Sequence, residues 1–114
     1  MLTATCHCGD VRVDVPVVPS VVADCNCSIC RRYGVLWAYY PQASVTVHAA
    51  PGATDGYVWG RNVLRFVRCK RCGCVMLWER VVPVAGSKMG INARNFDPAE
   101  LGKPEIEFLD GAAD

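Results

Sequence analysis

The sequence predicts a mainly β protein made of small stacked antiparallel sheets, and two observations support this prediction. Apolar and polar residues alternate in many short segments, which is the pattern of strands with one buried face. These segments recur about every ten residues. Turn-forming pairs such as Pro51-Gly52 and Ala85-Gly86 separate them, as expected for short strands joined by turns.

The strands are expected along almost the whole chain. In Val11–Val15, valine alternates with arginine and aspartate, so one face of this strand should be buried. Segments rich in β-branched and aromatic residues have the same tendency. On these grounds, further strands are expected at residues 2–6, 21–24, 36–40, 45–48, 64–68, 75–79, 89–93 and 105–109.

Helix signals are few. Asp97 is suited to an N-cap and is followed by Pro98, which predicts about one helical turn over residues 97–101. A second short turn of helix is expected to start at Ser28, because a C-x-x-C spacing spans about one helical turn.

Length and composition indicate a single domain over residues 1–114, with 52% hydrophobic residues. No segment approaches the run of about 20 apolar residues that crosses a bilayer. The segment from Met1 to Cys6 lacks the features of a secretory signal, so we expect a cytoplasmic protein without a membrane partner. The formal net charge of +1 gives no general attraction to nucleic acid, which we do not expect as a partner.

The eight cysteines are interpreted as metal ligands rather than as a disulfide framework. A reducing compartment disfavours disulfides. Cys6 and Cys8 lie two residues apart, as do Cys25 and Cys27, and such pairs can bind one ion but seldom bridge each other without strain. The alternative is that reduced cysteines pack as small hydrophobic residues.

Four cysteines form two chelating pairs suited to one closed structural zinc site. Such sites have four protein ligands, commonly delivered in short pairs. Cys6 and Cys8 form the first pair, and Cys69 and Cys72 form the second. Because zinc ligation can contribute ~10 kcal/mol or more in small modules, loss of this ion should unfold the chain.

Cys25, Cys27 and Cys30 place three thiols within six residues and are the candidate catalytic site. A catalytic zinc keeps three protein ligands and leaves one position for water or substrate. Three thiolates weaken zinc as a Lewis acid for water but leave an opening suited to another sulfur ligand. We therefore expect an open zinc site, a second zinc per chain, and a thiol substrate.

A fourth protein ligand could instead close this second site, and three residues are candidates. His7 should point away from the face shared by its neighbouring cysteines, and His48 lies in an alternating strand pattern. Cys74 is the strongest rival, because Cys72-Gly-Cys74 is itself a chelating spacing.

Residues beside the triplet provide candidates for contact with the substrate. Arg31, Arg32 and Tyr33 follow it directly and are placed to meet a carboxylate or an oxyanion, or else form a solvated turn. Five aromatic residues on predicted strands are interpreted as packing residues without a site role. They are Trp37, Tyr39, Tyr40, Trp59 and Trp78.

Four motifs, in this order, resemble those of the glutathione-dependent formaldehyde-activating family, which also includes the centromere protein V group. They are Cys6-His-Cys-Gly-Asp-Val-Arg12, Cys25-Asn-Cys-Ser-Ile-Cys-Arg-Arg-Tyr-Gly34, Cys69-Lys-Arg-Cys-Gly73 and Gly90-Ile-Asn-Ala-Arg-Asn-Phe-Asp97. Any one of them alone would be a weak signal, whereas the ordered set at these separations is specific. The match spans most of the chain.

The resemblance implies a fold, cofactors and an activity. It implies an Mss4-like zinc-bound fold, a structural zinc on the four paired cysteines and a second zinc on the remaining three. The activity it implies is addition of glutathione to formaldehyde, giving S-hydroxymethylglutathione, which is classed with the carbon–sulfur lyases. The chain departs from larger members in its short length and in Cys74 after the last cysteine pair.

Two functions of other classes remain open from the sequence. A non-catalytic zinc module could bind protein or nucleic acid through the basic residues between Arg61 and Arg71. A labile zinc on the triplet could instead serve in zinc storage or sensing. Neither of these would convert an aldehyde.

Overall fold

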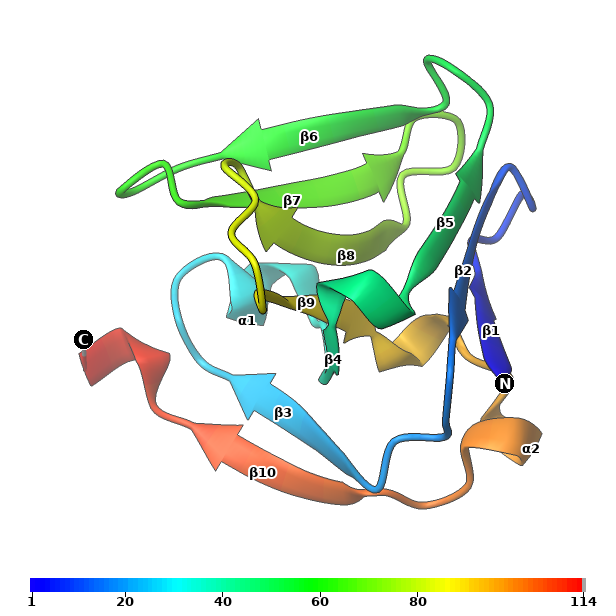
Figure 1. The fold of residues 1–114 in the computed structure, drawn as a ribbon. Coiled ribbons are helices and arrows are strands. Elements are labelled where there is room, and N and C mark those ends of the chain that lie inside the picture. The colour runs from blue at the N-terminus through cyan, green and yellow to red at the C-terminus, as the bar shows by residue number, and fades with distance from the viewer. Residues whose placement is uncertain (114) are drawn as a thin grey trace.

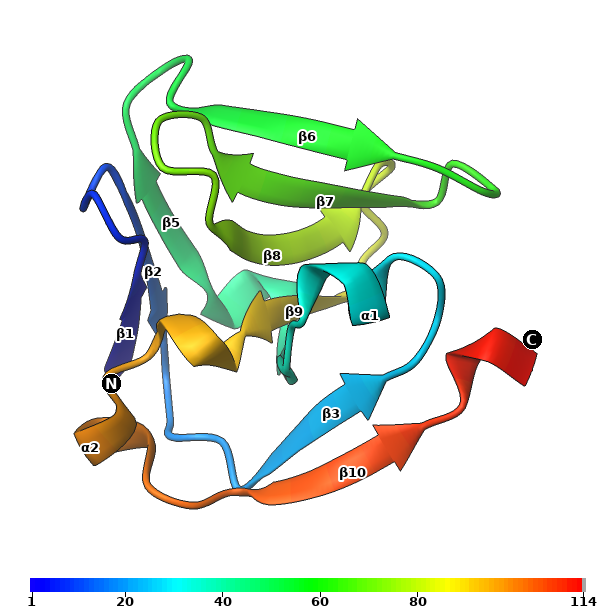
Figure 2. The same ribbon diagram turned by 180° about the vertical axis from the view of Figure 1, so that it is seen from behind.

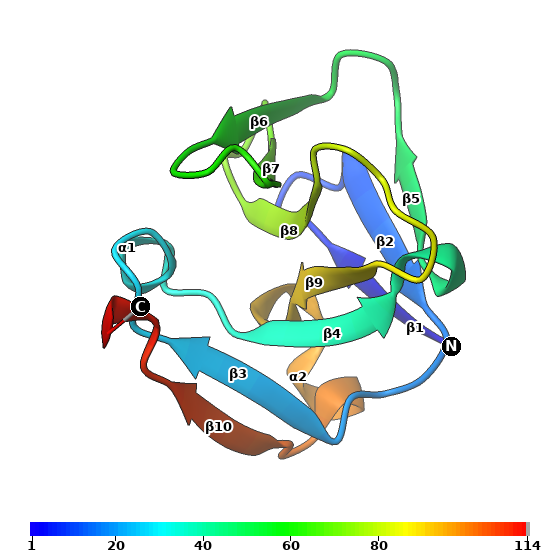
Figure 3. The same cartoon turned by 60° about the vertical axis from the view of Figure 1, so that its left-hand side comes forward.

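Residues 1–113 are described by the computed structural model, which contains two β-sheets among these residues (Figure 1). The three-stranded sheet has the order β1-β2-β5 and is antiparallel throughout. The seven-stranded sheet has the order β10-β3-β4-β9-β8-β7-β6. Figure 3 shows this larger sheet curving from β6 at one end to β10 at the other.

The strands are short and the helices are single turns. The smaller sheet contains β1 (Leu2–Thr5), β2 (Val11–Val15) and β5 (Thr46–Ala49). The larger sheet contains β3 (Val21–Cys25), β4 (Trp37–Pro41), β6 (Thr54–Val58), β7 (Leu64–Cys69), β8 (Val75–Arg80), β9 (Lys88–Asn92) and β10 (Glu105–Leu109). The α-helices are α1 (Cys30–Tyr33) and α2 (Pro98–Leu101), and 3-10 turns cover Gln42–Ser44, Ala93–Asn95 and Gly111–Ala113.

The mainly β prediction is confirmed, with three differences in detail. The strand β6 was not expected from the sequence. The pairing of β10 with β3 is parallel, whereas all other strand pairs within the described residues are antiparallel. The helical turn near Ser28 begins at Cys30, because the preceding residues form a turn. The turn after Asp97 forms as expected, with the Asp97 carboxylate accepting from the Ala99 N–H.

Two hydrophobic clusters lie in this fold. The larger cluster combines apolar residues of the small sheet, such as Val13, with residues of the large sheet, such as Leu77 and Ile91. The smaller cluster centres on Trp37 and Phe66. The four paired cysteines belong to or pack against the larger cluster, and the triplet belongs to or packs against the smaller one. The fold thus separates the two sets of cysteines.

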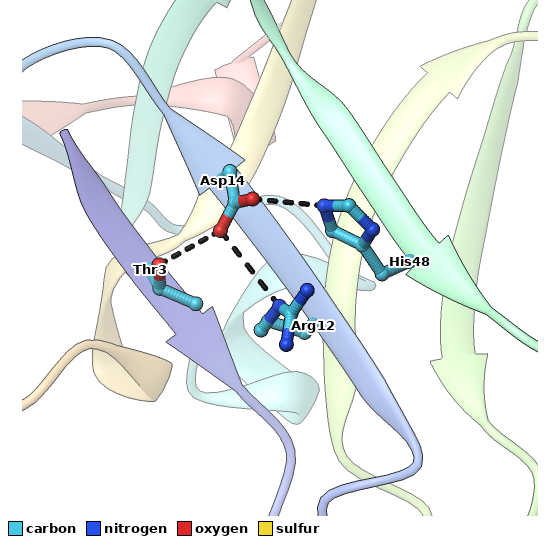
Figure 4. Close-up of polar contacts among 4 residues, drawn as sticks. All are labelled: Thr3, Arg12, Asp14 and His48. Carbon is cyan, nitrogen blue, oxygen red and sulfur yellow. Dashed lines mark hydrogen bonds and ion pairs between the residues drawn. The ribbon is translucent and has the colours of Figure 1, made fainter.

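A polar network joins the three strands of the small sheet (Figure 4). The Thr3 hydroxyl donates to Asp14 Oδ1 over 2.7 Å, and His48 Nε2 lies 2.8 Å from Asp14 Oδ2. Arg12 Nε lies 3.9 Å from Asp14 Oδ1. The hydrogen bond from Thr3 and then the contact with His48 lower the pKa of Asp14. The His48 side chain therefore contacts Asp14 within the small sheet.

Candidate metal centres

The sulfurs of Cys6, Cys8, Cys69 and Cys72 all lie within 4.8 Å of one another, and we name them the closed group. Two come from the turn after β1, one ends β7, and one lies in the turn before β8. The group therefore contacts both sheets. The predicted grouping is found, although Cys8 and Cys69 lie 61 residues apart along the chain.

Tight turns present these sulfurs. The Val11 N–H donates to Cys6 Sγ over 3.3 Å, within the turn that carries Cys6 and Cys8. In the second turn, the Gly73 N–H donates to the Cys69 carbonyl over 2.9 Å, and Gly73 has a φ of 78°. A side chain at this φ would be strained, so glycine is needed to close the turn.

The sulfur spacing fits a tetrahedral metal ion. Cys6 Sγ lies 3.7 Å from Cys8 Sγ, which in turn lies 3.6 Å from Cys69 Sγ. A tetrahedron with metal–sulfur bonds of about 2.3 Å, the value for zinc, has edges of about 3.8 Å. A disulfide would hold two sulfurs about 2.05 Å apart. The closed group thus has the spacing of metal ligands.

One sulfur of the closed group is already suited to the anionic state. Hydrogen bonds from the backbone N–H of Cys74 and then from that of Cys8 lower the pKa of the Cys72 thiol to about 5. A thiolate is the form that binds a metal.

Cys25, Cys27 and Cys30 form the second set, which we name the triplet. Their sulfurs also lie within 4.8 Å of one another. Cys25 ends β3, Cys30 begins α1, and Cys27 lies between them in the connecting loop. The loop therefore wraps three sulfurs around one point, as the spacing predicted.

Three N–H groups point at the sulfurs of the triplet. The Cys27 N–H lies 3.5 Å from Cys25 Sγ, and the Cys30 N–H lies 3.4 Å from Cys27 Sγ. The indole N–H of Trp37 donates to Cys30 Sγ over 3.3 Å. Donors of this kind orient metal-ligating groups and stabilise their negative charge.

Burial opposes ionisation of two of these thiols. It raises the pKa of the Cys25 thiol, and it raises that of the Cys30 thiol to about 12. Burial acts in the same direction on Cys27, but N–H donors led by that of Cys30 outweigh it and lower the Cys27 pKa. Metal binding must therefore release protons from the triplet.

The C-terminal turn packs directly against the triplet (Figure 2). A Cβ on Gly111 would lie 2.7 Å from Cys25 Sγ, so a side chain at position 111 would collide with the sulfur. The Asn26 side chain fixes this arrangement: its Nδ2 donates to Asp110 Oδ1 over 2.9 Å, and its Oδ1 accepts from the Ala112 N–H over 2.9 Å. No local pattern predicts this contact, because it joins segments that are far apart in the chain.

No fourth His, Cys, Asp or Glu ligand atom joins the triplet among residues 1–113. Cys74 contacts Cys72 and the His7 backbone N–H, so it lies beside the closed group. The His7 side chain is exposed, and His48 contacts Asp14. None of the three candidates for a fourth ligand is gathered with the triplet.

A cavity of about 570 Å³, which we name the pocket, opens onto all three cysteines of the triplet. Its other walls are mostly apolar. Aromatic walls come from Trp37, Tyr39, Trp59, Phe66 and Trp78. Aliphatic walls come from Ile29, Val63 and Leu64, and Arg61 is the one charged residue of the lining.

Strand pairing creates the aromatic wall. Tyr39 on β4, Gly90 on β9, Trp78 on β8 and Phe66 on β7 are successive partners across the sheet. A Cβ on Gly90 would lie 2.0 Å from the indole nitrogen of Trp78, so this glycine leaves the space that the indole ring fills. The Tyr39 and Trp78 rings lie 6.0 Å apart.

Four of the five aromatic residues that were interpreted as packing residues also line the pocket. Trp37, Tyr39, Trp59 and Trp78 line the pocket, whereas Tyr40 belongs to the larger core cluster. A glycine inside a strand often marks close approach of another group, so Gly90 was the available signal.

The basic and aromatic residues that follow the triplet do not line the pocket. Arg31 is exposed, and the Arg32 guanidinium donates to the Ser28 carbonyl over 2.8 Å. The Tyr33 ring packs 5.8 Å from that of Phe66. Instead, Tyr39 and Arg61 line the pocket, where residues that contact the substrate were expected.

Comparisons with known proteins agree with this architecture. Residues 1–110 match the model of a family described as glutathione-dependent formaldehyde-activating enzyme. The fold is similar to that of a Rhodobacter sphaeroides protein of known crystal structure, with a TM-score of 0.75 and 24% identity. That alignment covers 93% of this chain and 100% of the other, and it shows the likeness of the fold. Within the described residues, no helix has the length and apolar character needed to cross a membrane.

Proposed function

Because the chain belongs to the glutathione-dependent formaldehyde-activating enzyme family, we propose that it catalyses reversible addition of a small thiol to a small aldehyde. In the direction of adduct cleavage this is a carbon–sulfur lyase reaction. The observation that carries the proposal is the triplet, in which three sulfurs open onto a cavity and no fourth ligand joins them from residues 1–113.

The proposal assigns one zinc ion to each set of cysteines. Donor sets made only of sulfur suit zinc, and four such ligands are typical of structural sites. The closed group would therefore hold a structural zinc. The triplet has the ligand number of a catalytic zinc and lines the pocket, so it would hold a zinc ion that a substrate can reach.

Zinc bound at the triplet would favour the thiolate form of a thiol that reaches the open position. The residues of the chain supply the rest of the site. The N–H groups of Cys27, Cys30 and Trp37 keep the three sulfurs oriented. The apolar walls of the pocket would hold the aldehyde beside the sulfur, which favours reaction by proximity.

The reaction forms one carbon–sulfur bond and converts the aldehyde C=O into an alcohol. The proton of the thiol ends on this oxygen, so no oxidant or reductant is needed. Tyr39 supplies the only hydroxyl among the lining residues. Partial burial, and then the nearby Cys25 sulfur, raise its pKa to about 12, so the phenol stays neutral and can donate a hydrogen bond to the aldehyde oxygen.

The test is a measurement of exchange between formaldehyde and its thiol adduct by NMR, using glutathione and 2-mercaptoethanol in separate experiments. We expect the zinc-loaded protein to accelerate exchange with at least one thiol. The Cys27→Ser variant should lose this effect, because it lacks one ligand of the triplet. Exchange at the uncatalysed rate with both thiols would contradict the proposal.

The basic residues between Arg61 and Arg71 give less support to a nucleic-acid-binding module. Three of the arginines lie beside acidic side chains, which reduces the positive potential of this surface. The pairs are Arg65 with Glu79 at 3.4 Å, Arg68 with Asp55 at 3.8 Å, and Arg71 with Asp10 at 3.9 Å. We therefore favour the thiol–aldehyde reaction.

A further inference from the structure

We propose that the thiol substrate of the pocket has an aromatic or branched apolar body and a single anionic group, and that such a thiol is preferred over glutathione. This inference rests on the proposed function, because it assigns a substrate class to the same open site. It follows from the chemistry of the walls and from the position of one arginine.

The walls favour an apolar body. Beyond the triplet, the lining is aromatic or aliphatic except for Gly60 and Arg61. The volume of about 570 Å³ lies in the usual range for small-molecule sites and exceeds the need of formaldehyde alone. The Tyr39 and Trp78 rings are neighbours in this wall, with centres 6.0 Å apart and planes tilted by 58°. An aromatic ring placed here would gain contact with both side chains.

Arg61 favours one anionic group. It lies in the loop between β6 and β7 and is exposed, so this lining residue belongs to the rim of the pocket. It forms no ion pair with any residue the structure describes, whereas Arg65, Arg68 and Arg71 each have an acidic neighbour. A carboxylate on the substrate would give Arg61 a charged partner at the rim.

Glutathione matches this pocket less well. It carries two carboxylates and one ammonium group, and the lining offers a single cation and no carboxylate. A charged group that is moved from water to an apolar wall without a partner is strongly disfavoured. Glutathione must therefore leave most of its charged groups in solvent, where the aromatic walls add little to its binding.

The experiment compares three thiols by isothermal titration calorimetry with the zinc-loaded protein. They are 4-(sulfanylmethyl)benzoate, its uncharged methyl ester and glutathione. We expect the benzoate to bind at least about tenfold more tightly than glutathione, and the ester to bind between them.

Two variants separate the contribution of the apolar walls to binding from the contribution of the Arg61 charge. Arg61→Ala should weaken binding of the benzoate by about threefold to tenfold and leave the ester unchanged. Trp59→Ala should weaken both aromatic thiols, because it removes part of the wall. Lys103→Ala is the control, because this exposed residue lies outside the lining and its loss changes net charge by the same amount.

The outcomes distinguish failure of the proposed substrate class from failure of the proposed function. If glutathione binds as tightly as the benzoate, or if Arg61→Ala and Lys103→Ala have equal effects, the substrate class is wrong while the open thiol site stands. If none of the three thiols binds, the proposed function fails and the substrate class fails with it.

Discussion

Trp37 shows how one side chain can act on the candidate metal site without being a ligand. It is 2% exposed, and its indole N–H donates to Cys30 Sγ over 3.3 Å. Its ring also packs against Phe66, with ring centres 6.2 Å apart. Packing thus holds the indole in place while its N–H stabilises negative charge on the sulfur.

Replacing Trp37 by phenylalanine should weaken zinc binding at the triplet by about 10- to 100-fold, the usual effect of losing such a contact. Zinc affinity can be measured by competition with a chromophoric chelator. Trp78→Phe is the matched control, because Trp78 lines the same pocket and has no hydrogen bond to a sulfur. Equal affinities in the two variants would contradict a role for the indole N–H.

At the scale of single residues, the cysteines were the most predictable part of the site. A short chelating spacing restricts where two sulfurs can lie, so sequence alone grouped Cys6 with Cys8 and Cys69 with Cys72. The position of Trp37 depends instead on how β4 packs against α1 and β7, which local spacing does not reveal.

The C-terminal turn contains no cysteine of the triplet but packs against it. Gly111→Ala should disturb the triplet, because the added Cβ would lie 2.7 Å from Cys25 Sγ and 3.0 Å from Cys27 Cβ. We expect zinc at the triplet to be lost or weakened while the closed group keeps its ion and the fold persists. Zinc analysis and circular dichroism measure these effects.

Ala112→Ser is the control for this prediction, since position 112 is exposed in the same turn. A Gly111→Ala protein that holds two zinc ions with unchanged affinity would show that the turn does not constrain the triplet.

The small sheet should owe part of its stability to the ionised Asp14. Its pKa is lowered from 3.8 in the folded state, so its stabilising contribution is present above pH 3.8 and is lost as pH falls through the lower folded pKa. Asp14→Asn should therefore unfold at lower urea concentration than the natural chain at pH 5, where the Asp14 carboxylate is ionised. The margin should close as the pH falls further and Asp14 becomes protonated. A margin that stays constant or widens below pH 3.8 would contradict the assigned network.

The strand β6 illustrates what sequence patterns miss at the scale of elements. It contains Asp55 and Gly56, and both residue types are depleted in strands. Gly56 is accommodated because the Arg65 side chain covers it, leaving only 2.7 Å between Arg65 Cδ and a Cβ built on the glycine. Pairing with β7 thus determines this edge strand more than its own residues do.

At the scale of the whole molecule, the alternating segments were sufficient to predict the fold class. They did not reveal the order of the strands, because pairing joins segments far apart in the chain, such as β4 with β9 and β3 with β10. The pocket depends on that order, since Tyr39 and Trp78 meet only across Gly90.

We propose that the chain forms one domain in which the two cysteine sets have unequal roles. A zinc ion at the closed group would link the turn after β1 to the turn between β7 and β8, and thereby the small sheet to the large one. The triplet lies in one loop, so its ion would contribute less to the fold and more to binding.

Zinc content per chain, measured before and after a chelator and a small thiol, tests this account most directly. We predict two zinc ions, of which only one is readily removed by the chelator or perturbed by 2-mercaptoethanol. Cys27→Ser should remain folded with one ion, whereas Cys72→Ser should unfold. The account would be contradicted by a single tightly held ion or by a second ion that does not respond to thiols. It would also be contradicted if Cys27→Ser unfolded while Cys72→Ser remained folded.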